Sequence, residues 1–241
     1  MFRTYMLYIL LVCVYGSAMS GQRVGSQSAP RKCDDFLPKL MIFEVDRVFW
    51  PFQVETDVVP PFGLRRYQPI SNENSTKLWS GDFEGRELFD SKGRVLQVYS
   101  YASEAISTVW KKGTKIAVTA TTTKIPTVKH LLRLFDLDEH ISVMEIDDSS
   151  SLDHVKKIKE ATGLQFKDIV YLGSNRVMLN EIKRTLKVLT VYISPKSGLN
   201  VMHIYYAIYF YNLRPYIARC KAHRLGQRMP GRLNTVKARP S

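Results

Sequence analysis

The chain is poor in cysteine and lacks a long uninterrupted apolar run. Three cysteines in 241 residues exclude a small scaffold stabilised by disulfide bonds. The apolar run at residues 5–15 is shorter than the ~20 residues that span a bilayer as a helix. A hydrophobic content of 45% with 24% charged residues excludes wholesale disorder. A chain of this length forms one mid-sized domain with extensions rather than two large domains.

Acidic residues are absent from both ends of the chain. Residues 1–33 contain four of the 35 lysines and arginines, residues 201–241 contain eight, and neither segment contains an acid. The segment between them, 34–200, is nearly neutral, with 23 basic and 22 acidic residues. No specific nucleic acid is therefore predicted. Residues 201–239 are a candidate contact for an anionic membrane or another polyanion, and a solvated, disordered tail over 214–241 is the alternative interpretation.

The first 20 residues have the pattern of a secretory signal peptide. One positive charge precedes the apolar run. Small residues stand at 18 and 20, the two positions that signal peptidase recognises before a cleavage site after residue 20. The sequence thus predicts a signal peptide over 1–20, a linker over 21–36 and a secreted protein, with a cytoplasmic protein as the alternative if the segment is not used. In the secretory pathway Asn74 is a candidate glycosylation site, and Cys33 and Cys220 are a candidate pair.

Short apolar runs alternate with helical patterns from residue 37 onward. The strands are expected at residues 40–45, 115–119, 141–146, 169–172 and 188–193. Helices are expected between them at 103–112, 127–135 and 152–161, and a last helix at 201–213. This alternation predicts an α/β fold with a doubly wound parallel sheet and helices on both faces. Residues 63–100 interrupt it as an insertion with a hairpin near residues 90–93, which is either a lid over the site or a surface loop.

Functional residues are expected directly after the strands, because ligands of such sheets bind beyond the carboxyl ends of the strands. The first strand runs into Glu44-Val45-Asp46 and then into Trp50-Pro51-Phe52. This string resembles the first motif of the haloacid dehalogenase-like (HAD) phosphatases, and specifically of the magnesium-dependent phosphatase family. Residues 131–137 resemble the helix before that family's third motif. The resemblance covers residues 37–213 and implies a HAD-like, Rossmannoid phosphatase domain.

The resemblance also implies where the catalytic groups should lie. The family uses an aspartate nucleophile, an aspartate general acid, a Ser or Thr and a lysine that bind phosphate, and an acidic pair that helps to hold Mg²⁺. Aligned without gaps, the nucleophile position is Glu44 and the general acid is Asp46. The hydroxyl position is Ala120, the lysine position is Ser151, and Gly173 and Ser174 replace the acidic pair.

Only Glu44 and Asp46 then remain as anionic ligands for the family's Mg²⁺, an ion that binds through carboxylates and substrate oxygens. We therefore expect the metal to bind weakly or not at all. The leading hypothesis is a catalytically impaired or inactive pseudophosphatase that acts by binding. The alternative is an active Mg²⁺-dependent phosphatase that hydrolyses phosphomonoesters, such as phosphotyrosine or sugar phosphates, with Glu44 and Asp46.

Overall fold

The computed structural model describes residues 37–66 and 86–226. The predicted signal peptide, Cys33, Asn74 and the end of the predicted tail lie outside the described residues. The predicted pairing of Cys33 with Cys220 and the glycosylation of Asn74 therefore stay predictions.

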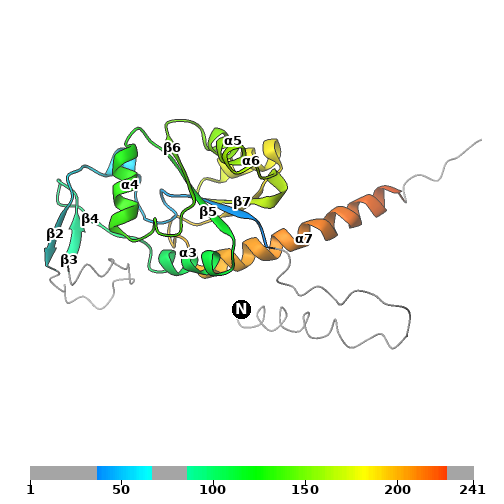
Figure 1. Cartoon of the computed structure of the whole chain (residues 1–241), viewed down its shortest axis with the longest axis horizontal. Helices are drawn as coiled ribbons and strands as arrows, with labels where there is room; N and C mark the ends of the chain where they lie inside the picture. The colour runs from blue at the N-terminus through cyan, green and yellow to red at the C-terminus, as the bar shows by residue number, and fades with distance from the viewer. Residues whose placement is uncertain (1–36, 67–85, 227–241) are drawn as a thin grey trace, which may run out of the picture. The chain divides into compact units, whose positions relative to one another are not determined.

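A parallel sheet of five strands forms the centre of the domain, in the order β6-β5-β1-β7-β8 (Figure 1). The central strand β1 is buried along most of its length, because β5 and β7 pair with its two edges and helices cover both faces of the sheet. This arrangement confirms the predicted α/β class. The strands are β1 (Leu40–Glu44), β5 (Lys115–Thr121), β6 (Val143–Asp147), β7 (Ile169–Gly173) and β8 (Leu189–Tyr192).

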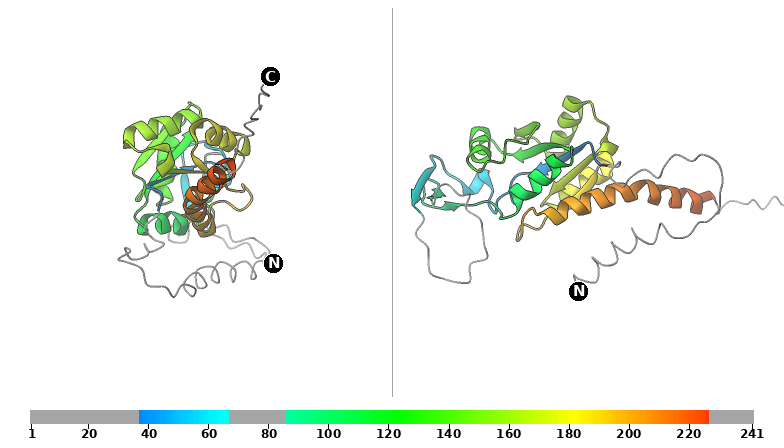
Figure 2. Two further views of the ribbon diagram at one scale, coloured as in Figure 1. Left: turned by 90° about the vertical axis from the view of Figure 1, so that its right-hand side faces the viewer. Right: turned by 60° about the horizontal axis from the view of Figure 1, so that its bottom comes forward.

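Helices cover both faces of this sheet, each with its own apolar cluster (Figure 2). One cluster joins side chains of β1 such as Phe43 to helices α3 (Ala102–Lys111), α4 (Ile125–Leu134) and α7 (Val201–Gly226). The other joins Ile42 of the same strand to α5 (Ser151–Thr162) and α6 (Arg176–Leu186). Successive side chains of a strand point to opposite faces, so odd and even positions of β1 serve different layers.

Two helices differ from the sequence prediction. Helix α6 was not predicted, although Leu179, Ile182 and Leu186 supply its buried face. Helix α7 continues to Gly226, past the predicted end at residue 213, so the first part of the predicted tail is helical. The first glycine after residue 198 is Gly226, and six of the eight residues 218–225 are alanine, leucine, lysine or arginine, which are good helix formers.

The insertion contains a small antiparallel sheet of β2 (Gly63–Arg66), β3 (Arg86–Phe89) and β4 (Val95–Leu96). The predicted hairpin lies between β3 and β4, where Asp90 Oδ1 accepts hydrogen bonds from the amides of Lys92 at 3.0 Å and Arg94 at 2.8 Å. Gly93 takes the positive φ of 76° that the turn requires. Two further short helices complete the described elements, α2 (Val54–Asp57) and η2 (Phe166–Asp168).

Candidate functional site

The predicted site residues gather at the carboxyl edge of the sheet. Glu44 ends β1 and is paired in register with Thr119 of β5. Gly173 ends the neighbouring β7, and Ser174 follows it. Strand pairing, not sequence proximity, therefore brings these residues together.

The carboxylate of Glu44 is held by the loop that follows β7. Its Oε2 accepts hydrogen bonds from the backbone amide of Ser174 at 2.7 Å and from the Ser174 hydroxyl at 3.0 Å. The amide of Asn175 adds a third. Burial raises the pKa of Glu44 above its ordinary value, and these donors partly oppose the rise.

Gly173 provides the space that the longer Glu44 side chain needs. A Cβ at position 173 would lie 2.9 Å from Glu44 Oε2 and 3.0 Å from Cε1 of Tyr171. The glutamate at position 44 and the glycine at position 173 therefore fit together, because the Glu44 carboxylate occupies the space that a side chain at 173 would need.

Asp46 uses both of its oxygens within its own loop. Its Oδ1 accepts from the Trp50 indole Nε1 at 2.9 Å, and its Oδ2 accepts from the amide of Val54 at 3.1 Å. Trp50 is fully buried and stacks on Phe52, with ring centroids 5.3 Å apart. The aromatic-proline string of the motif therefore fixes the orientation of this carboxyl group. Burial raises the pKa of Asp46 to about 6.

Replacing Asp46 by asparagine is expected to change how stability depends on pH. The pKa of Asp46 is raised from 3.8 to about 6, so the folded state binds the proton more tightly than the unfolded state. Asp46 therefore stabilises the fold below about pH 4, and this contribution is lost as the pH rises through 6. In urea unfolding, the free energy of unfolding of the parent, relative to that of Asp46→Asn, should therefore increase by up to about 3 kcal/mol as the pH falls from 7 to 4. A constant difference over that range would contradict the raised pKa.

A buried tyrosine, which the sequence prediction treated as an ordinary strand residue, lies on the same face as Glu44. The hydroxyl of Tyr171 is 3.1 Å from Thr119 Oγ1 and also forms a hydrogen bond with Ser151. Burial raises the pKa of this phenol, and the Glu44 charge raises it further. The phenol therefore reaches from β7 to the predicted lysine position at the start of α5.

Ala120 lies on the opposite face of the sheet, packed in the cluster beneath α3 and α4. The strand alternation instead puts the hydroxyl of Thr119 on the face of Glu44. Lysines near Ser151 have other partners: Lys156 Nζ lies 2.8 Å from Asp153, and Lys157 Nζ lies 2.5 Å from Asp147.

Tyr171→Phe is expected to lower the free energy of unfolding by about 1–2 kcal/mol, because it leaves the hydroxyls of Thr119 and Ser151 without a buried partner. Urea unfolding measures this loss. Tyr101→Phe is the matched control, since Tyr101 is 60% exposed and its change should be within about 0.5 kcal/mol. Equal stability of the parent and Tyr171→Phe would mean that this hydroxyl bridge contributes nothing.

Glu55 of α2 binds the residues that follow β5. Its carboxylate accepts from Thr122 Oγ1 at 2.5 Å, from the amide of Thr123 at 2.9 Å and from Thr123 Oγ1 at 3.0 Å. The Thr122 hydroxyl, followed by the Thr123 donors, holds the pKa of Glu55 below its ordinary value. Lys124 Nζ reaches the carbonyls of Val54 at 3.2 Å and Val58 at 3.0 Å. The polar donors after β5 are therefore occupied by a carboxylate of the chain itself.

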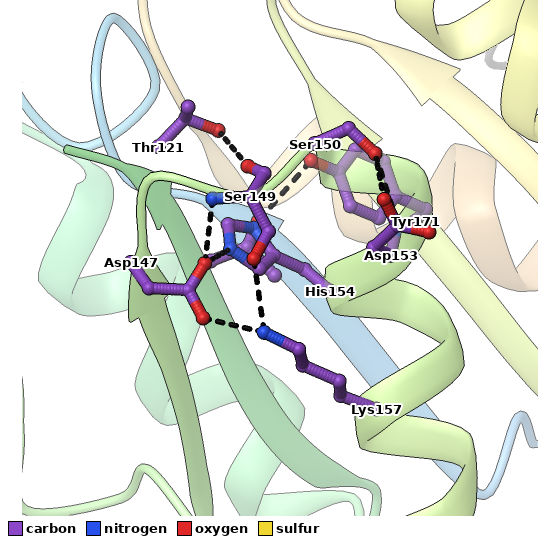
Figure 3. A network of polar contacts seen from close by, with 9 residues as sticks. Thr121, Asp147, Ser149, Ser150, Asp153, His154, Lys157 and Tyr171 are labelled. Carbon is purple, nitrogen blue, oxygen red and sulfur yellow. Dashed lines mark hydrogen bonds and ion pairs between the residues drawn. The ribbon is translucent and has the colours of Figure 1, made fainter.

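Asp147, at the end of β6, is the centre of a network at the start of α5, in which Figure 3 also shows Tyr171. Its Oδ1 accepts from the amide of Ser149 at 2.8 Å and lies 2.7 Å from Nε2 of the buried His154. Lys157 and then Ser149 and His154 hold its pKa well below the usual range. This acid fixes the start of α5.

No cluster of three or more metal-ligating His, Cys, Asp or Glu side chains occurs within residues 37–66 and 86–226. The carboxylates nearest to the predicted metal position are Glu44 and Asp46, whose oxygens have the protein donors given above.

Comparisons with known proteins agree with the motif. A family model described as Acid Phosphatase matches residues 36–214. The human protein Magnesium-dependent phosphatase 1 is 26% identical over 165 residues, which cover 68% of this chain and 82% of that protein.

Two solved structures are more distant. The Mg-complexed phosphatase domain of BF1531 from Bacteroides fragilis has 14% identity and a TM-score of 0.44, covering 71% of this chain and 40% of that chain. A predicted phosphoglycolate phosphatase from Haemophilus somnus has 18% identity and a TM-score of 0.38, covering 45% of this chain and 48% of that chain. This chain thus spans less than half of either.

Proposed function

This chain belongs to the acid phosphatase family, a family of Mg²⁺-dependent HAD-like phosphatases. We propose that it is a pseudophosphatase, a member of the family that binds a partner or ligand without hydrolysing phosphate esters. The family resemblance deduced from the first motif is confirmed. The loss of catalysis is our proposal, and it is argued from the side chains at the carboxyl edge of the sheet.

The observation that carries the proposal is the state of Glu44. A carboxylate nucleophile needs an oxygen that is unprotonated, free of strong donors and in line with the phosphorus atom. Glu44 Oε2 instead accepts from the Ser174 amide at 2.7 Å and its hydroxyl at 3.0 Å. We infer that Glu44 is a structural residue that joins β1 to the loop after β7.

The residues present do not fit a magnesium ion. Mg²⁺ loses its water reluctantly and needs an octahedral set of oxygens, among which carboxylates supply the charge. Gly173 and Ser174 supply no carboxylate, and both oxygens of Asp46 already accept hydrogen bonds, from Trp50 and Val54. A metal at this edge would have to share oxygens that already accept hydrogen bonds, with no further carboxylate at 173 or 174 to supply charge.

The groups that would bind phosphate are also missing or engaged. The lysine position is Ser151, which is 3% exposed and bonded to Tyr171. The hydroxyls and the amide after β5 bind Glu55. Charge stabilisation of the transferring phosphoryl group dominates this chemistry, so these losses support an inactive protein.

One observation favours the alternative of an active phosphatase. Asp46 has its pKa raised to about 6, which suits a general acid that donates a proton to a leaving group near neutral pH. In that hypothesis Glu44 leaves Ser174 and acts as the nucleophile, and the substrates are phosphomonoesters such as phosphotyrosine or sugar phosphates.

A hydrolysis assay distinguishes these functions. The purified chain is incubated with an aryl phosphate, a phosphotyrosine peptide and a sugar phosphate, each with and without millimolar Mg²⁺. Asp46→Asn is assayed in parallel to identify contaminating phosphatases, and human Magnesium-dependent phosphatase 1 is the positive control. We expect the same background for the parent and Asp46→Asn. Mg²⁺-dependent turnover by the parent that Asp46→Asn abolishes would refute the pseudophosphatase.

We also propose that the protein enters the secretory pathway, from the charge and apolar pattern of residues 1–20. N-terminal sequencing of the protein made in its own cells tests this directly. A mature chain that begins at Gly21 is expected, and a chain that retains residues 5–15 would contradict it.

A further inference from the structure

Helix α7 has apolar side chains on two faces, and among the described residues one face is buried and the other is about half exposed. Ile204 and Ala207 are fully buried against the domain, with Val201, Ile208 and Tyr211 packed beside them. A second set remains in solvent at 42–53% exposure, namely Met202, Tyr205, Tyr206, Tyr209 and Phe210. We call this second set the aromatic stripe.

The aromatic stripe is continuous because its residues follow helical spacing. Steps of three and four residues place side chains on one face of a helix, and the stripe advances in such steps from Met202 to Tyr206 and Phe210. Tyr209 and Phe210 contact each other edge to face, with centroids 5.5 Å apart. Contiguous exposed apolar surface of this kind marks an interaction site more often than isolated apolar residues do.

Positive charge accompanies the stripe. Helix α3 runs beside α7 (Figure 2), and Lys112, which follows α3, places its Nζ 5.6 Å from the centre of the Tyr205 ring. The sequence from residue 201 to the end contains eight lysines and arginines and no acid, and four of them fall within α7. An apolar stripe with a lysine beside it, on a segment whose own sequence contains no acid, matches a lipid surface that has an apolar interior and anionic headgroups.

The charge argues against a second copy of this chain as the occupant. Two copies joined through their stripes would bring two acid-free basic segments together, and like charges repel at short range. A single-stranded nucleic acid has the right charge, but proteins that stack bases do so in positively charged grooves. The stripe instead lies on the outer, convex surface of a helix.

The length of the stripe suits a helix that lies in the plane of a bilayer. No helix in the described part of the chain is long and apolar enough to cross a membrane. An amphipathic helix in the headgroup region needs an apolar face rich in aromatic residues and basic residues beside it. Tyrosine suits this position because its ring is apolar and its hydroxyl reaches water.

We propose that α7 docks the domain on an anionic lipid surface, with the aromatic stripe in the headgroup region and Lys112 against the lipid phosphates. This contact is independent of the carboxyl edge of the sheet. Its success or failure therefore leaves the assignment of a pseudophosphatase unchanged.

Vesicle co-sedimentation of the full chain tests this contact. Vesicles of phosphatidylcholine with about 30% phosphatidylserine are compared with pure phosphatidylcholine, at low and high salt. We expect binding to the anionic vesicles only, with a steep loss at high salt because surface charges are screened. Replacing the lysine beside the stripe, Lys112→Gln, should weaken binding by about 5-fold, the effect of ~1 kcal/mol for one charge.

Variants of the stripe separate membrane contact from folding. Tyr205→Ser with Tyr209→Ser and Phe210→Ser changes only half-exposed side chains, and it should reduce vesicle binding by about 100-fold or more. Val177→Ser on α6 is the matched control, since Val177 is 78% exposed and outside the stripe. Circular dichroism confirms that each variant is folded.

Two results would overturn the proposal. The first is equal binding to neutral and anionic vesicles, or binding that the triple serine variant retains. The second is another occupant of the stripe: a dimer of the parent in sedimentation velocity that the triple variant dissociates, or single-stranded RNA that binds through the stripe while vesicles do not.

Discussion

Gly173→Asp is expected to destabilise the chain by about 4 kcal/mol. Its Cβ would lie 2.9 Å from Glu44 Oε2 and 3.0 Å from the Tyr171 ring. Both neighbours are fixed, Glu44 by Ser174 and Tyr171 by Thr119. The new carboxylate would also face that of Glu44 in a buried environment, where like charges are unfavourable. Urea unfolding at neutral pH measures the loss.

A double-mutant cycle gives the decisive comparison. Glu44→Asp shortens the opposing side chain, so Gly173→Asp should cost about 2 kcal/mol less in that background than in the parent. Gly63→Asp is the matched control, because a Cβ at Gly63 meets nothing within 4 Å. If the two substitutions are additive, Glu44 and Gly173 are not coupled and our account of the motif is wrong.

Restoring the family's carboxylates should restore a metal site. We expect the triple variant Glu44→Asp, Gly173→Asp and Ser174→Asp to bind Mg²⁺ about 100-fold more tightly than the parent. This figure assumes a gain on the order of 10-fold for each of the two added carboxylates. The physical reason is that it adds two anionic ligands and removes the Ser174 hydroxyl that engages position 44. Isothermal titration calorimetry measures the affinity directly.

Stability provides a second readout for the same variant. A ligand that binds only the folded state raises the melting temperature, so Mg²⁺ should stabilise the triple variant and leave the parent unchanged. The control adds the same charge elsewhere, as Gly63→Asp with Val95→Asp in the small sheet. An equal response of the control would indicate nonspecific binding, and an absent response of the triple variant would contradict the assigned register.

The fold could be predicted because each layer leaves a periodic pattern in the sequence. All five strands of the large sheet were located to within a few residues, since each is an apolar run bounded by polar residues. Helix α6 was missed although Asn175 accepts from the amides of Val177 and Met178 as a typical N-cap. The end of α7 was misjudged because basic residues are common both in tails and in exposed helices.

The candidate site was only partly predictable. The motif and the alignment that it implied pointed to Glu44, Asp46, Gly173 and Ser174, and the structure places Glu44 against Ser174. It was not sufficient to show that Ser174 donates to Glu44, or that Glu55 binds the residues after β5. These contacts depend on the register between strands and on loops far apart in the sequence. The face of each β5 residue, Thr119 or Ala120, also follows from that register, because a shift of one residue exchanges the two faces.

The central claim is that the carboxyl edge of the sheet does not hold a divalent ion. The indole N–H of Trp50 donates to Asp46 at 2.9 Å, so its NMR resonance reports directly on that carboxylate. In a titration of the ¹⁵N-labelled parent with Mg²⁺ up to tens of millimolar, we predict that this resonance moves no more than that of Trp110, which is 54% exposed on α3. A saturable shift of the Trp50 resonance alone would contradict the account, because it would place the ion at Asp46.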